Sequence, residues 1–105
     1  MHAMKKAEAS KLINGLYALI GAEPHVNATR ERQAKAILLK IRRAFWKQSQ
    51  LREKVGFVRA GFELWFHARR LADSGADAKR VKRNLYADIA RLDNALTTAI
   101  RRENG

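Results

Sequence analysis

The stretch that decides the fold is residues 77–103, DAKRVKRNLYADIARLDNALTTAIRRE. Its large apolar side chains recur every three or four residues: Val81, Leu85, Ile89, Leu92 and Leu96. That spacing places them on one side of a helix with 3.6 residues per turn, whereas a strand would need strict alternation. A helix is therefore predicted from Asp77, which could cap its N-terminus, to about Glu103.

The same spacing predicts three more helices before this one: residues 3–21, from Asn27 or Thr29 to about Gln50, and from about Leu51 to Asp73. The polar segment 47–50 has no glycine or proline, so a turn near Ser49 and one continuous helix are both open. The turn is favoured, because helices much longer than about 25 residues without caps are unusual. Four helices with short connections predict a single all-α domain over residues 1–105, an up-down-up-down antiparallel four-helix bundle.

The composition is strongly basic and lacks cysteine. The 105 residues include 22 Lys and Arg against 10 Asp and Glu, for a formal net charge of +12. The absence of cysteine excludes disulfides, thiolate zinc sites and iron–sulfur clusters. Residues 30–59 hold ten basic and two acidic residues, and residues 69–83 hold six basic and two acidic residues. The excess charge is therefore concentrated, and it favours a polyanionic partner.

A helical wheel of residues 30–50 separates an apolar side from a basic side that also carries Leu39 and Trp46. Lys and Arg neutralise phosphates, and an exposed Trp could stack on a splayed base. The alternative is a solvated charged face, with Trp46 covered by a neighbouring helix or subunit. The predicted nucleic-acid-binding residues are Arg32, Lys35, Arg42, Arg43, Trp46, Lys47, Arg52, Arg59, Lys79, Arg80 and Arg83.

The helix expected over residues 51–73 has an apolar arc that covers more than half of its circumference. A helix with so wide an arc is either central in its fold or covered by a partner. We therefore expect a protein interface on this helix, formed by Phe57, Trp65 and Phe66. The alternative is an aromatic side chain that simply lies half-exposed.

No catalytic or cofactor motif is apparent. The three histidines, His2, His25 and His67, have no spacing that suggests a metal pair, and there is no glycine-rich phosphate loop. We therefore expect a non-catalytic protein without metal or cofactor. No apolar run approaches the ~20 residues of a membrane-spanning helix, so a soluble cytoplasmic protein without membrane contact is expected.

The order of features resembles a family of small four-helix proteins. The stretches that carry the resemblance are Glu23-Pro24-His25, Arg32 to Trp46, Phe62 to Arg70 with Leu71-Ala72, and Leu85 to Arg102. The family includes the accessory variability determinant of diversity-generating retroelements and the proteins encoded in ribosomal-RNA intervening sequences. The resemblance implies a ring-like homo-oligomer that binds nucleic acid beside a reverse transcriptase. The family's usual Gly-Trp in the last helix is replaced here by Thr97-Thr98.

These observations predict a non-catalytic, basic helical accessory protein that binds RNA or single-stranded DNA backbone within a larger nucleoprotein assembly. It would have a protein partner there, with a reverse-transcriptase accessory subunit as the type. One alternative is a small helical subunit of a CRISPR effector complex, which has a similar size and charge. Another is a protein-interaction module, or a phage-type inhibitor, that docks on an acidic surface. A helix-turn-helix reader of duplex DNA is less favoured, because no short turn and recognition helix are apparent.

Overall fold

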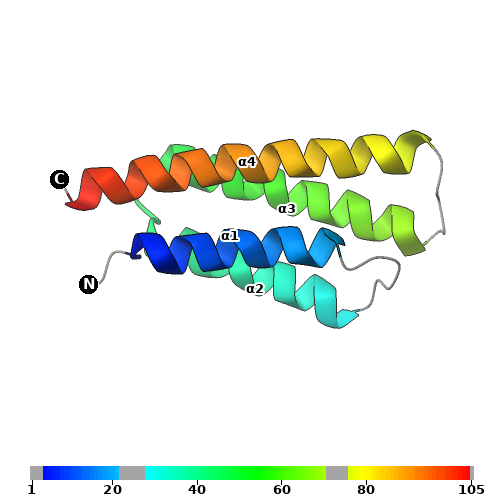
Figure 1. Ribbon diagram of the computed structural model, residues 1–105, viewed down its shortest axis with the longest axis horizontal. Helices are drawn as coiled ribbons and strands as arrows, with labels where there is room; N and C mark the ends of the chain where they lie inside the picture. The colour runs from blue at the N-terminus through cyan, green and yellow to red at the C-terminus, as the bar shows by residue number, and fades with distance from the viewer. Residues whose placement is uncertain (1–3, 22–27, 71–75, 105) are drawn as a thin grey trace.

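The computed structural model describes residues 4–21, 28–70 and 76–104, and nearly all of these are helical. The helices are α1 (Lys6–Gly21), α2 (Ala28–Ala44), α3 (Ser49–Arg70) and α4 (Ala76–Asn104). Successive helices run in opposite directions and form a bundle that measures 46 × 23 × 19 Å (Figure 1). The described ranges contain no strand. The predicted all-α, up-down-up-down four-helix bundle is confirmed.

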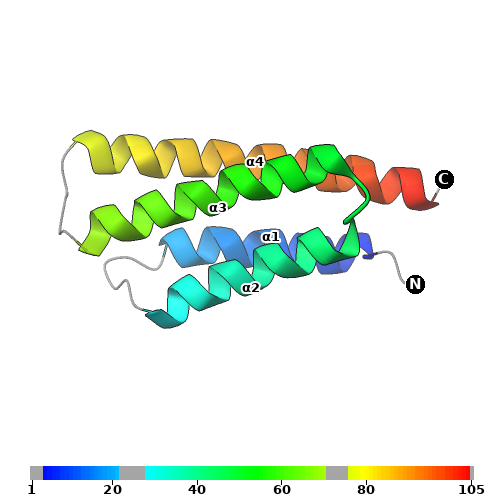
Figure 2. The same cartoon turned by 180° about the vertical axis from the view of Figure 1, so that it is seen from behind.

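Each helix packs against two others. α2 and α4 both contact α1 and α3, so α1 and α3 are diagonal neighbours. Seen from one side, α2 and α3 form the front layer, and α1 and α4 lie behind them (Figure 2). The start of α1, the end of α4 and the turn between α2 and α3 share one end of the bundle (Figures 1 and 2).

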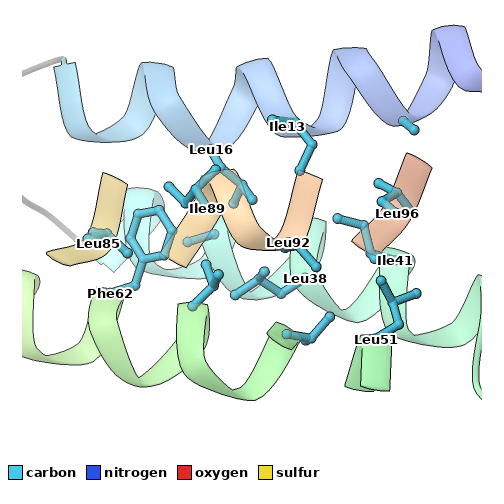
Figure 3. Close-up of a cluster of buried hydrophobic side chains, with 14 of the residues drawn as sticks. Ile13, Leu16, Leu38, Ile41, Leu51, Phe62, Leu85, Ile89, Leu92 and Leu96 are labelled. Atoms are coloured by element: carbon cyan, nitrogen blue, oxygen red, sulfur yellow. The ribbon is translucent and has the colours of Figure 1, made fainter. Parts of the chain in front are cut away.

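The core is entirely apolar within the described residues, and all four helices contribute to it (Figure 3). Leu16 from α1 and Ile41 from α2 are fully buried. The apolar stripe from which α4 was predicted is fully buried at four side chains: Leu85, Ile89, Leu92 and Leu96. Burial of these stripes removes apolar surface from water and is the main term that stabilises the bundle.

α2 ends earlier than predicted, at Ala44 instead of about Gln50. Residues 45–48 form the turn, in which the Gln48 amide donates to the Phe45 carbonyl oxygen at 3.0 Å. The Gln48 carbonyl oxygen then accepts from the Arg52 amide at 3.1 Å, which begins α3. The buried Phe45 side chain anchors this turn to the core. A turn near Ser49 is therefore confirmed, and the continuous helix is wrong.

The other predicted ends lie within a few residues of the observed ones. α4 begins at Ala76, so Asp77 lies inside the helix and not at the capping position. Two of the stretches that carry the family resemblance, residues 23–25 and 71–72, lie outside the described residues, as do His2 and His25. None of the described helices is long and apolar enough to cross a membrane.

Part of the wide apolar arc of α3 is covered within the bundle by α2 and α4, whereas Phe57 and Leu64 stay exposed. Trp65 is 2% exposed, and the Lys82 Nζ from α4 lies 5.8 Å from its ring centroid. Phe66 is 3% exposed and lies beside Ala34 and Leu38 of α2, with which it lines a small hollow. The structure therefore places Trp65 and Phe66, two of the three predicted interface residues, in the core of the bundle. Phe57, the third predicted interface residue, is 51% exposed.

Candidate nucleic-acid interface

A groove of about 420 Å³ is lined by residues of α2 and α3, the two helices that are in front in Figure 2. Four of the predicted binding residues line it together, Lys35 and Arg42 from α2 and Arg52 and Arg59 from α3. No carboxylate contributes to the lining. Its remaining residues are apolar or glycine: Leu38, Leu39, Val55 and Gly56. The groove therefore combines concentrated positive charge with an uncharged centre.

The turn between the two helices explains why these side chains meet. In an antiparallel helical hairpin, residues at equal distances from the turn lie at the same height along the two helices. Lys35 and Arg59 are each twelve residues from Lys47, and Arg42 and Arg52 are each five residues from it. Two cations therefore mark each end of the groove, and the ends are about 10.5 Å apart at 1.5 Å per residue. The apolar residues fall between them in the same register.

Gly56 contributes space to the groove. A Cβ atom built at this position would meet nothing within 4 Å, so the missing side chain leaves open volume above the α3 backbone. Leu38 and Val55 are buried and form the bottom of the groove, whereas Leu39 is 42% exposed at its edge. The centre of the groove is therefore a shallow apolar floor between charged ends.

The positive charge is not uniform along the groove. The Nε atom of Arg59 lies 3.6 Å from Oε1 of Glu63, one turn further along α3, in an exposed ion pair. Beyond this pair a second hollow of about 200 Å³ includes Glu31 and Glu63 in its lining, together with Lys35 and Arg59. The Arg42–Arg52 end, near the turn, is consequently the more electropositive end of the groove.

The remaining predicted residues on α2 and its turn are exposed but lie outside the groove lining. Arg32 and Arg43 are exposed on α2, and Lys47 is exposed in the turn. Trp46 is 53% exposed, with the Lys47 Nζ 5.4 Å from its ring centroid. Neighbouring helices therefore do not cover Trp46 in the monomer, and its stacking on a base stays a prediction.

Lys79, Arg80 and Arg83 form a separate basic surface. They are exposed in the first turns of α4, at the end of the bundle opposite the α2–α3 turn. They do not line the α2–α3 groove. The predicted site residues are thus divided between the two ends and the middle of the molecule, and only four of them converge.

Sequence reasoning missed the uncharged part of the site, above all Val55 and Gly56. A wheel drawn for one helix separates basic from apolar residues, but it does not tell which residues of the next helix stand opposite. The signal in the sequence is that the basic residues of the two helices lie at equal distances before and after Lys47. This spacing can be recognised only when the position of the turn is known.

Metal-ligating groups do not cluster in the parts of the chain that the structure describes, where no group of three His, Cys, Asp or Glu side chains could hold an ion.

Outside the groove, the Tyr17 and Tyr86 rings stack between α1 and α4 with centroids 5.6 Å apart. Burial, and then the negative charge of Asp93, raise the pKa of the Tyr17 phenol above its ordinary value. That contact belongs to the packing of the bundle.

The geometry of the groove suits an elongated anionic ligand with an uncharged part between two anionic groups. Cations held on two packed helices can pair with phosphate without a large rearrangement of the fold. In comparisons of sequence and of fold, no family model, curated protein or solved structure matches the chain. The functional reading therefore depends on the groove itself.

Proposed function

We propose that the protein binds the backbone of RNA or single-stranded DNA in the α2–α3 groove, as a non-catalytic subunit of a larger nucleoprotein assembly. The observation that carries this proposal is the convergence of Lys35, Arg42, Arg52 and Arg59 on one groove without a lining carboxylate. Phosphate contacts of this kind release condensed counterions, which makes affinity high at low salt and steeply dependent on salt.

The test is a salt series of binding to a fluorescent single-stranded oligonucleotide. Each neutralised phosphate contributes roughly −0.7 to the slope of log affinity against log salt on a single strand. Replacement of both Arg42 and Arg52 by Gln removes two such contacts, so we expect the slope to become shallower by about 1.4. Binding should also weaken at every salt concentration.

The matched control replaces Lys6 and Lys11 by Gln. Both are exposed on α1, which is diagonal to α3, and the loss of net charge is the same as in the groove variant. We expect this control to leave the slope within about 0.3 of the wild-type value, since long-range charge is screened over about 10 Å at 0.1 M salt. Equal effects of the two variants would contradict a localised site, and an absence of low-salt binding would contradict the proposal.

For the assembly itself, we propose a reverse transcriptase as the partner protein, because the family resemblance implies one. When one of the two proteins is tagged, the other should co-purify only weakly from a nuclease-treated lysate. The complex should form again when a single-stranded nucleic acid is added. The alternative partner is a CRISPR effector complex. The same experiment, carried out with each candidate partner in turn, distinguishes the two.

A second candidate function is docking on a protein, and the exposed face of α3 favours it. Phe57 and Leu64 are 51% and 59% exposed and lie seven residues apart, on one side of the helix. This function predicts a partner that is retained in full after nuclease treatment and lost when both residues are replaced by Ser. Retention by the Phe57→Ser, Leu64→Ser variant would contradict it.

A further inference from the structure

The α2–α3 groove has a centre that phosphate contacts alone do not explain. A surface that only neutralises a backbone needs cations, yet the residues between the two cation pairs are Leu38, Leu39, Val55 and Gly56. Leu38 and Val55 are nearly fully buried, but they still line the open volume. Leu39, which is 42% exposed at the edge, is the apolar side chain of the lining that water reaches, and a ligand that covers it removes apolar surface from water.

Resting on the proposed function, we propose that this floor receives one unstacked base of a single strand, while the cation pairs at both ends hold the flanking phosphates. The two pairs are about 10.5 Å apart, roughly three times the ~3.4 Å rise per nucleotide along one strand of a duplex. The phosphates that they hold are therefore about three steps apart along the strand, with this base in the stretch between them.

The chemistry of the floor favours the flat face of a base over its hydrogen-bonding edges. The floor residues offer aliphatic side chains and the side-chain-free surface of Gly56, where a Cβ would meet nothing within 4 Å. Contact with a base face is tolerant of sequence, because every base has such a face. The ligand class is thus a single strand with accessible bases. A duplex keeps the faces of its bases stacked inside, so it has no free base face to place on this floor.

The experiment compares binding of the wild-type protein to short oligo(dT) and to an abasic strand of the same length and charge. If a base lies in the groove, oligo(dT) binds about fivefold more tightly, the low end of the effect of a base stacked on an aromatic ring, because this floor is aliphatic. If the protein contacts only backbone, the two strands bind equally, which overturns this inference and leaves the proposed function standing. Binding of neither strand overturns both.

A variant locates the base. Gly56→Leu fills the open volume from the α3 backbone, and we expect it to lower oligo(dT) affinity to the abasic level without a change in abasic binding. The matched control Ala18→Leu adds the same side chain on the exposed side of α1 and should change neither affinity. Circular dichroism checks that both variants keep the helical fold. A preference for oligo(dT) that survives Gly56→Leu places the base elsewhere, for example on Trp46, and overturns the inference.

Discussion

Residue by residue, the two tryptophans divide the molecule into surface and core. Trp65 is 2% exposed between α3 and α4, whereas Trp46 is 53% exposed in the α2–α3 turn. Residue type alone treats them alike, because both are large and apolar. The difference arises from position. Trp65 lies on the side of α3 that meets α4, and Trp46 follows the last residue of α2 by only two positions.

Substitution by alanine should separate the two roles. We expect Trp65→Ala to lower the free energy of unfolding by about 3–5 kcal/mol, since it removes a buried ring and leaves a cavity. Trp46→Ala should change it by less than about 0.5 kcal/mol, as is usual for an exposed side chain. Urea unfolding followed by circular dichroism measures both values. A comparable loss in the two variants would mean that Trp46 is covered in solution, for instance by a second subunit.

On the scale of the helices, the number of helices could be predicted from periodicity, because each apolar stripe marks the side that must be buried, and their alternating direction from the short connections. The residue at which α2 ends could not be predicted. Residues 45–50 contain no glycine or proline, so no local signal separates a turn at 45–48 from further helix. The end is set by tertiary packing, in which Phe45 turns into the core. Because the groove depends on this turn for its register, the candidate site could be predicted only as a stripe of cations.

α3 carries two glycines whose surroundings differ, and they predict different outcomes of the same substitution. A Cβ at Gly56 meets nothing within 4 Å, whereas a Cβ at Gly61 lies 3.0 Å from Cδ1 of Leu85 in α4. Alanine in a helix interior is worth about 1 kcal/mol over glycine. We expect Gly56→Ala to gain about that amount, and Gly61→Ala to gain less because Leu85 must shift against a packed core.

Urea midpoints of the two variants, measured beside the wild type, test this difference. Both substitutions remove the same backbone freedom from the unfolded chain, so the comparison isolates the contact with α4. An equal gain at both positions would mean that α3 and α4 do not approach as closely at Gly61 as the structure has them.

For the molecule as a whole, 22 basic side chains outnumber 10 acidic ones, which leaves a net charge of +12. Lys40 with Glu8, Arg59 with Glu63, and Arg91 with Asp88 all form exposed pairs. Exposed pairs each contribute little, typically below about 1 kcal/mol. The apolar core therefore stabilises a fold whose surface charges repel one another, and repulsion is greatest when salt is low.

The bundle should consequently become more stable as sodium chloride is added, which is the opposite of what a fold stabilised by ion pairs would do. Screening shortens the Debye length from about 30 Å at 0.01 M to about 10 Å at 0.1 M. If screening removes about 1 kcal/mol of repulsion, the thermal midpoint rises by roughly 4–8 °C for a domain near this size. Thermal unfolding followed by circular dichroism across that range measures the shift.

The control for this effect lowers the net charge without touching the core. Lys6→Glu with Lys11→Glu lowers the net charge by four units at two exposed positions of α1, so its midpoint should be higher at low salt and respond less to added salt. A wild-type midpoint that falls with salt would show that ion pairs outweigh the repulsion. A rise in midpoint that is equal in both proteins would point to a general salt effect on apolar burial. A weaker response in the variant ties the stability of the free bundle to the same unbalanced charge that a bound polyanion would neutralise.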